Sequence, residues 1–340
     1  MRALIVHPGP HFSVADVARG WARGLTELGV EVRTFELDKL LDYFSFAYTD
    51  RNGEIVKAHT EEEAISLAAG QIKAVCYEWW PDLVIVVSGF FMYPMLVEMM
   101  AERHRHIVYL CTESPYEDDI QMAKAAWPWD AVVLNDPTNI EGFRQVTSAP
   151  VIYAPHAYDS AVHYRAPAKH HADVSWIGTC YPSRAAFLEQ VDWSGLDVSF
   201  GGNFQDCPET ITRFVGHDLD DCVDNDVTAE VYRGSLASFN IYRAETNGQL
   251  SDTADGWAMG PREVEMARCG LWFARQSRPE SDEVFPMLPT FSDPQELGDQ
   301  LRWAIANPEA RMMAVERAFA AVEDRTFPNN ASALLQALGL

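Results

Sequence analysis

Residues 256–274, GWAMGPREVEMARCGLWFA, contain a glycine-bounded loop, a helical segment and an apolar strand in direct succession. Pro261 suits the first turn of a helix over 260–269, and Gly270 separates that helix from a strand over 271–274. A helix that leads directly into a buried strand is the repeating unit of a parallel α/β sheet. This stretch therefore predicts an α/β fold.

The same alternation extends over the rest of the 340 residues. Further strands are expected over 3–7, 31–36, 83–87, 106–111, 131–134, 151–154, 173–178, 197–201 and 238–242. Further helices are expected over 13–28, with Ser13 as N-cap, and over 60–80, 118–126, 137–146, 183–191, 228–237, 294–306, 309–324 and 330–338.

This pattern, which a polar passage interrupts once, predicts two Rossmann-like domains. The first domain is expected over 1–155 and the second over 173–325. An interdomain connection over 156–172 joins them, and a C-terminal helix occupies 326–340.

The charge, the cysteines and the apolar runs each limit what the protein can bind and where it can be located. The net charge is −24, with 50 acidic against 26 basic residues, whereas proteins that grip nucleic acid need a basic surface. The six cysteines form no C-x-x-C pair and the histidine pairs lack further ligands at metal spacing, so we expect no metal site. The longest apolar run, 83–100, is broken by polar residues and proline, and the N-terminus lacks a secretory pattern. We therefore expect no membrane span and a cytoplasmic protein.

The loop 256–260 and the helix after it form the strongest candidate site. Backbone amides at the start of a helix and the helix dipole together bind anions, and Arg262 adds positive charge. Glu265 follows one turn later, where its two oxygens can accept hydrogen bonds from both hydroxyls of a ribose. Arg184 and Arg243, near the ends of neighbouring elements, are further candidates for phosphate contact in place of Mg²⁺. For each arginine, a solvated surface charge is the alternative.

Two strand ends in the first half are further candidates. The turn after the first strand contains His11 and leads into a helix, so its backbone amides could bind an anion or a polar sugar. A turn with a purely structural role is the alternative. Glu113 follows the strand 106–111 and suits a general base or a ligand of sugar hydroxyls; the acids near it also suit the first turn of a helix. No G-x-G-x-x-G follows the first strand, which argues against NAD binding. Gly201-Gly202-Asn203 is interpreted as a turn.

Several of these motifs together resemble one family. Arg262-x-x-Glu265 with Cys269-Gly270 is similar to the R-x-F-E-x-x-x-C-G segment of the CgeB-like, spore-maturation type glycosyltransferases of bacteria and phages. Further matches in the same order are Thr112–Tyr116, Pro155–Asp159, Asp173–Gly178, Phe239–Arg243 and Asp324–Phe327. The resemblance covers nearly the whole chain. It implies a GT-B fold, with two Rossmann-like domains facing across a cleft, the nucleotide-sugar donor on the second domain, and C-terminal helices.

The resemblance also implies an activity: transfer of a sugar from a nucleoside-diphosphate sugar, here a UDP-sugar, to a hydroxyl group, with retention and without a metal or other cofactor. The residues expected to bind the donor are Gly178, Arg184, Arg243, Trp257, Met259, Gly260, Pro261, Arg262 and Glu265. The expected catalytic residues are Glu113 and His11. Two positions depart from the wider pattern, since Trp257 stands where an acid is usual and Thr179 where an arginine is common.

The acidic surface favours a protein acceptor, such as a coat or virion protein, or a glycan over DNA, and a phage-encoded enzyme would act in the host cytoplasm. Three alternatives stay open at this point. They are a phage enzyme that glycosylates a DNA base, a nucleotide-sugar epimerase on the same fold, and a nucleotide sensor without activity.

Overall fold

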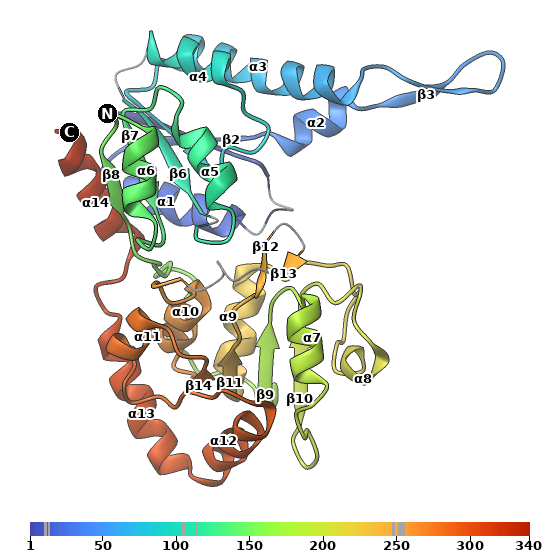
Figure 1. The fold of residues 1–340 in the computed structure, drawn as a ribbon, viewed down its shortest axis with the longest axis vertical. Helices are drawn as coiled ribbons and strands as arrows, with labels where there is room; N and C mark the ends of the chain where they lie inside the picture. Colours follow the sequence, from blue (N-terminus) through green and yellow to red (C-terminus); the bar gives the residue numbers. More distant parts are fainter. Residues whose placement is uncertain (10–11, 13, 104–105, 113, 247–248, 251–255) are drawn as a thin grey trace. The chain divides into compact units, whose positions relative to one another are not determined.

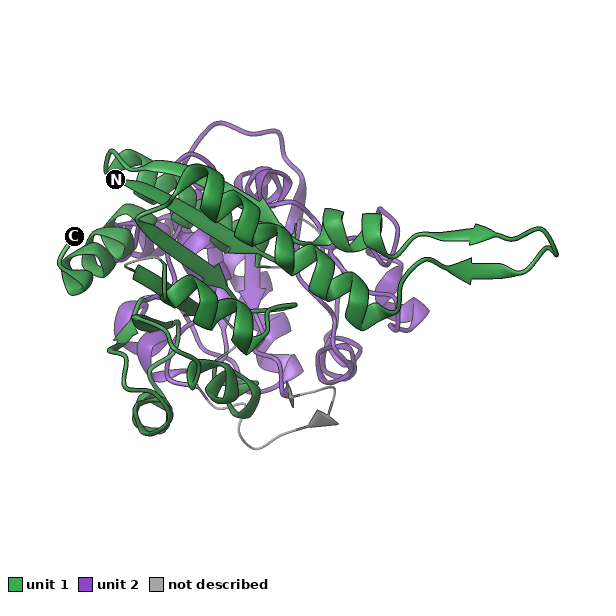
Figure 2. Cartoon of the chain, turned by 90° about the horizontal axis from the view of Figure 1, so that it is seen from above, with its two compact units in different colours: residues 1–154, 327–340 green, residues 155–326 purple. Residues whose placement is uncertain are grey.

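The computed structural model describes residues 1–340 except 10–11, 13, 104–105, 113, 247–248 and 251–255. The chain forms two compact units, coloured green and purple in Figure 2. The first contains Met1–Ala154 and Phe327–Leu340, and the second contains Pro155–Thr326. Residues 156–172, expected to be a connection, therefore belong to the second unit, and the C-terminal helix belongs to the first.

The first unit is built on a six-stranded parallel sheet (Figure 1). Its strand order is β2-β1-β5-β6-β7-β8. Its strands are β1 (Arg2–His7), β2 (Glu31–Glu36), β5 (Leu83–Val87), β6 (His106–Cys111), β7 (Ala131–Leu134) and β8 (Val151–Tyr153). Its helices are α1 (Ala15–Glu27), α2 (Asp38–Phe44), α3 (Glu61–Trp79), α4 (Pro94–Ala101), α5 (Asp118–Ala125), α6 (Ile140–Val146) and α14 (Phe327–Leu338). A hairpin of β3 (Ala47–Thr49) and β4 (Ile55–Lys57) extends away from the sheet.

Local sequence signals explain most of these boundaries. All five residues of β5 are buried, as expected for a central parallel strand with both faces covered. Thr60 and Glu63 form a capping box that fixes the start of α3. The expected N-cap of α1, Ser13, lies outside the described residues. The helix has Val14 as its N-cap, and none of the described side chains caps it.

The C-terminal helix α14 packs on α1, at the other end of the sequence. Two glycines of α1 make this contact possible: a Cβ on Gly20 would lie 2.2 Å from the Phe327 ring, and one on Gly24 would lie 2.6 Å from the Phe327 carbonyl carbon. Small residues on α1 therefore determine how closely α14 approaches.

We expect Gly24→Ala to destabilise the protein by about 1–3 kcal/mol, because the backbone of α14 must move to admit one methyl group. Gly70→Ala in α3 is the matched control, since no atom lies within 4 Å of its added Cβ. It should stabilise by about 0.5–1 kcal/mol through helix propensity alone. Urea unfolding of both variants measures the difference, and equal effects would contradict the close approach.

The second unit contains a four-stranded parallel sheet with the order β10-β9-β11-β14. Its strands are β9 (Ala172–Ile177), β10 (Val198–Gly201), β11 (Ser235–Asn240) and β14 (Trp272–Arg275), with a separate hairpin of β12 (Glu245–Thr246) and β13 (Gln249–Leu250). Its helices are α7 (Pro182–Leu188), α8 (Glu209–Thr212), α9 (Asn225–Gly234), α10 (Pro261–Cys269), α11 (Pro279–Val284), α12 (Pro294–Ala306) and α13 (Pro308–Ala321). Stacked Trp176 and Phe239 lie in its core.

Strand order predicts where each unit would bind a ligand. In the second unit the chain passes from β9 to β10 on one side and later to β11 on the other. The carboxyl ends of β9 and β11 therefore flank a topological switch point, where open α/β sheets usually bind ligands. In the first unit β1 lies in the same way between β2 and β5. Among the described residues, none of the helices has the length and apolar character needed to cross a bilayer.

Candidate functional site

The start of α10 lies at the switch point of the second unit. Gly260 is the N-cap, with an extended backbone (φ −78°, ψ 153°), and Pro261 occupies the first turn as the sequence predicted. A Cβ on Gly260 would lie 3.2 Å from the side-chain nitrogen, Nδ2, of Asn240, the last residue of β11. Within the part of the chain that the structure describes, no side chain caps this end of the helix. Its dipole and amides are therefore oriented to bind an anion.

Arg262 connects α10 to the end of β9. Its Nε donates a 2.6 Å hydrogen bond to the carbonyl oxygen of Ile177. The guanidinium group also packs against Gly178, where an added Cβ would lie 3.0 Å from Nη2. The structure therefore brings together Gly178, Gly260 and Arg262, three of the residues predicted to bind the donor.

Arg184 and Arg243 meet at the ring of Tyr181. Arg243 donates a 3.3 Å hydrogen bond to the Tyr181 hydroxyl, and the two guanidinium carbons lie 5.4 Å and 5.7 Å from the ring centroid. Arg184 also donates a 2.8 Å bond to the carbonyl oxygen of Thr179. Both arginines thus contact residues 179–181, directly after the Gly178 that Arg262 touches, and place cationic side chains along this segment.

Glu245 is an acid at this site that sequence reasoning missed. It is buried and accepts bonds from the amide and the hydroxyl of Ser183, at 2.7 Å and 2.9 Å, at the start of α7. Burial opposes ionisation, but these hydrogen bonds and one from Ala244 hold the pKa of the carboxyl below its ordinary value. Glu245 is therefore held as an anion beside Ser183, the residue that precedes Arg184.

The remaining predicted donor residues differ in their surroundings. Glu265 is half-buried and lies three residues after Arg262, so both share one side of α10. Burial, together with the charge of Glu265, raises the pKa of Tyr232.

The two loop residues in the predicted donor set differ in burial. Trp257 is half-buried, whereas the side chain of Met259 packs into the hydrophobic core. Met259 stays a predicted donor residue, and its buried side chain leaves its backbone as the part that could contact a donor.

The buried acid Glu263 connects several elements of the site. Its side chain has no solvent exposure and accepts hydrogen bonds from Asn240 (2.5 Å), the Tyr242 hydroxyl and the Ser281 hydroxyl. Burial raises the pKa of this carboxyl, and the three hydrogen bonds offset the shift only in part. Glu263 thus ties α10 to the end of β11 and to α11.

The raised pKa of Glu263 predicts a pH-dependent stability. Below its ordinary pKa of 4.5 the carboxyl is neutral in both the folded and unfolded protein. Above that pH the unfolded state releases the proton first, so the stability falls as the pH rises toward the folded-state pKa. Glu263→Gln removes this titration. We expect the stability of the wild type relative to the variant to fall by up to about 1.4 kcal/mol per pH unit.

Urea unfolding of both proteins between about pH 4 and about pH 7 measures this difference. A difference that stays constant across the range would show that Glu263 does not titrate in it.

The predicted catalytic residues His11 and Glu113 lie outside the described residues. The strand end that precedes Glu113 is described: the hydroxyls of Ser88 and Thr112 form a hydrogen bond there. Burial raises the pKa of Asp118 at the start of α5. Within the described part of the chain, no group of three or more His, Cys, Asp or Glu side chains is arranged to hold a metal ion.

Sequence comparison finds a family match that lies mostly in the second unit. The family model described as "Glycosyl transferase-like" matches residues 184–336, a range that includes Arg184, Arg243, Arg262 and Glu265. A comparison with curated protein sequences finds no match.

Solved structures resemble the whole chain. Sucrose-phosphate synthase from Thermosynechococcus elongatus has a TM-score of 0.64 and 10% identity, over 99% of this chain and 98% of that one. An alpha-glucosyltransferase in complex with UDP has a TM-score of 0.63 and 11% identity over both full lengths. A protein described as a putative UDP-N-acetylglucosamine 2-epimerase from Listeria monocytogenes has a TM-score of 0.59 and 14% identity, over 99% of this chain and 95% of that one.

These likenesses at low identity concern the fold, and they extend over both parallel α/β units. They confirm the predicted GT-B fold, and the family match confirms the predicted enzyme class. The chain therefore has a GT-B fold, and its residues 184–336 match a family of glycosyl transferase-like enzymes.

Proposed function

We propose that this protein transfers a sugar from a nucleoside-diphosphate sugar, a UDP-sugar, to a hydroxyl acceptor, and that the donor binds at the start of α10. The amides of Gly260 and Arg262 would donate hydrogen bonds to the diphosphate, and the guanidinium groups of Arg184, Arg243 and Arg262 would neutralise its charge. Glu265 would accept hydrogen bonds from the ribose hydroxyls. The observation that carries the proposal is the bond from Arg262 to Ile177, which places a cation between two strand ends at a switch point.

The proposed transfer uses these positive charges to stabilise the departing diphosphate. The bond between the anomeric carbon and the diphosphate oxygen breaks, and its electron pair stays on the diphosphate. The acceptor oxygen bonds to the same carbon, and its proton passes to a phosphate oxygen, with retention of configuration. Cationic side chains and helix amides stabilise the departing diphosphate in the role that Mg²⁺ has in other enzymes. We therefore expect activity to survive EDTA.

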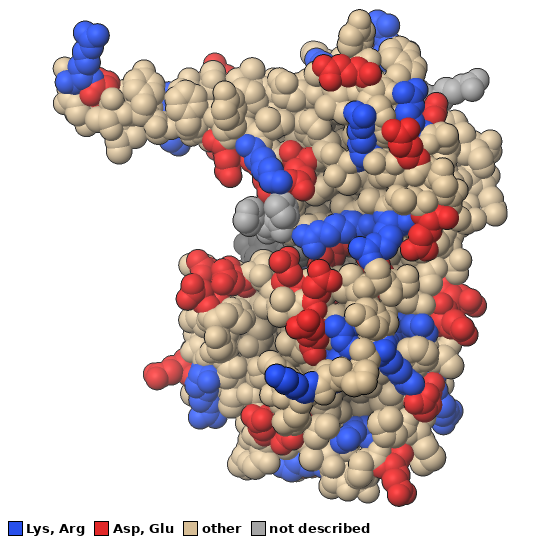
Figure 3. Space-filling model, turned by 180° about the vertical axis from the view of Figure 1, so that it is seen from behind, with Lys and Arg blue, Asp and Glu red and all other residues tan. Residues whose placement is uncertain are grey.

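A hydroxyl on a protein, such as a coat or virion protein, or on a glycan is the proposed acceptor, within the cytoplasm of a bacterium or of a phage host. The net charge of −24 opposes a long DNA contact, and basic side chains on the face in Figure 3 are interspersed with acidic ones. The motifs around Arg262 support a CgeB-like enzyme. DNA is the second candidate acceptor, because a similar alpha-glucosyltransferase, with a TM-score of 0.60, has been solved with UDP and a 13-mer DNA.

Transfer assays with radiolabelled UDP-, GDP-, TDP- and ADP-sugars test the proposal. Each donor is incubated with the full chain and with protein, glycan or DNA acceptors, with and without EDTA. We expect label from a UDP-sugar on a protein or glycan. Label on DNA alone would reject the proposed acceptor, and release of nucleotide at a rate independent of any acceptor would favour an epimerase. Nucleotide binding without turnover of any donor would indicate a sensor.

A further inference from the structure

The backbone of the loop before α10 is held by the segment that begins α11. The Glu280 amide donates a 3.1 Å bond to the carbonyl of Trp257, and Arg278 donates a 3.1 Å bond to the carbonyl of Ala258. The Met259 amide in turn donates a 2.8 Å bond to Oε2 of Glu280. Three consecutive loop residues are thus fixed by two residues about twenty positions further along the chain.

Glu280 is the centre of this arrangement. It is only 2% exposed, and its second oxygen, Oε1, accepts a 2.7 Å bond from Arg325. The carbonyl of Arg325 accepts a 3.0 Å bond from the Tyr158 amide, and Thr326 pairs with Tyr158. One carboxylate therefore connects the loop before α10 to the two segments at the ends of the second unit.

Neither oxygen of Glu280 can lose its partner without cost. The Met259 amide is part of a buried residue, and a buried N–H without an acceptor is strongly unfavourable. Arg325 is also largely buried, with 17% side-chain exposure, so loss of the carboxylate leaves its charge without this counter-ion. Removal of the Glu280 side chain leaves the bonds to the carbonyls of Trp257 and Ala258 in place and takes the acceptor only from the Met259 amide. We therefore expect the change in the loop to be concentrated at Met259 and at Gly260, the residue that follows it.

We propose that Glu280 is a positioning residue for the donor site, which fixes the loop 257–260 so that the amides of α10 are already in place when the diphosphate arrives. Arg325 is its partner and holds the carboxylate in the orientation that reaches Met259. The inference rests on the proposed function, since it concerns the same nucleotide site. A preformed loop avoids paying the cost of ordering during binding.

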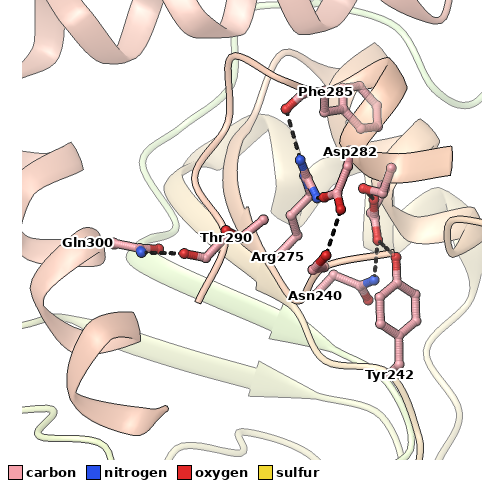
Figure 4. Close-up of polar contacts among 10 residues, drawn as sticks. Asn240, Tyr242, Arg275, Asp282, Phe285, Thr290 and Gln300 are labelled. Atoms are coloured by element: carbon pink, nitrogen blue, oxygen red, sulfur yellow. Dashed lines mark hydrogen bonds and ion pairs between the residues drawn. The ribbon is translucent and has the colours of Figure 1, made fainter. Parts of the chain in front are cut away.

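UDP is the probe for the test, titrated calorimetrically into the full chain. We expect Glu280→Ala to weaken UDP binding about tenfold and Glu280→Gln to weaken it less, because one amide oxygen can still accept from Met259. Asp282→Asn is the matched control on the same helix (Figure 4). Asp282 pairs with the buried Arg275, and its side-chain contacts are to Arg275 and Ser277. This control should lower the melting temperature and leave the Kd for UDP unchanged.

Hydrogen exchange without ligand gives a second readout. The Met259 amide should exchange faster in Glu280→Ala and at the wild-type rate in Asp282→Asn, if both are folded by circular dichroism. Arg325→Met should weaken UDP binding by itself but add nothing to Glu280→Ala, because the two residues act as one unit.

Each outcome is decisive. Unchanged exchange at Met259 with wild-type UDP affinity in Glu280→Ala would overturn the positioning role, as would equal losses of affinity in Glu280→Ala and Asp282→Asn. A wild-type chain that binds no UDP at all would instead overturn the proposed UDP site, whatever the exchange at Met259.

Discussion

Arg262→Ala and Glu265→Ala should each remove about half or more of the rise in melting temperature that UDP produces in the wild-type protein. A ligand at 100 times its Kd stabilises the folded state by about 2.7 kcal/mol. Each charged hydrogen bond to such a ligand contributes about 1.5–3 kcal/mol, so the loss of one lowers affinity by about ten- to a hundredfold. Arg262→Ala also removes the bond to Ile177, and we expect it to have the larger effect.

Arg268→Ala is the control for this pair. Arg268 lies on the same helix but donates to the carbonyl of Phe319 on α13 and stacks on its ring. Its loss should lower the melting temperature of the free protein while the shift with UDP persists. Differential scanning fluorimetry with and without UDP measures both quantities. A full UDP shift in Arg262→Ala and Glu265→Ala would place the donor elsewhere.

The fold was predictable because its determinants are local. The strands β2, β5, β6 and β7 have the bounds that the sequence predicted, since short apolar runs between turn residues specify parallel strands directly. The capping box at Thr60 likewise fixed the start of α3. The hairpin Ala47–Lys57 was not predicted, because its strands are exposed and carry no alternation that marks a core.

The candidate site was predictable only in part. Gly260, Pro261 and Arg262 follow a pattern within a few residues, whereas the partners of Glu263 come from 240, 242 and 281, and Arg325 lies 45 positions after Glu280. No local pattern specifies such contacts. The burial of the Met259 side chain could not be predicted for a related reason, since a methionine beside a candidate loop is equally typical of a ligand contact and of a core residue.

Gly202→Ala should destabilise the second unit by about 2–4 kcal/mol and weaken UDP binding, although residue 202 is outside the predicted donor set. Gly202 has a φ of +107°, which side chains rarely adopt, and its added Cβ would lie 2.4 Å from the carbonyl oxygen of Gly178. The Gly202 amide also donates a 3.1 Å hydrogen bond to His217, and this bond opposes a shift of the Gly202 backbone away from Gly178. The methyl group therefore displaces the backbone of Gly178.

Gly195→Ala separates this displacement from simple backbone strain. Gly195 also has a positive φ, +75°, but no atom lies within 4 Å of its added Cβ. It should cost about 1 kcal/mol in urea unfolding and leave the Kd for UDP unchanged. Because Arg262 packs against Gly178, only Gly202→Ala moves the surface on which that guanidinium rests. Equal losses of stability with wild-type UDP affinity in both variants would mean that the position of Gly178 does not matter for the donor.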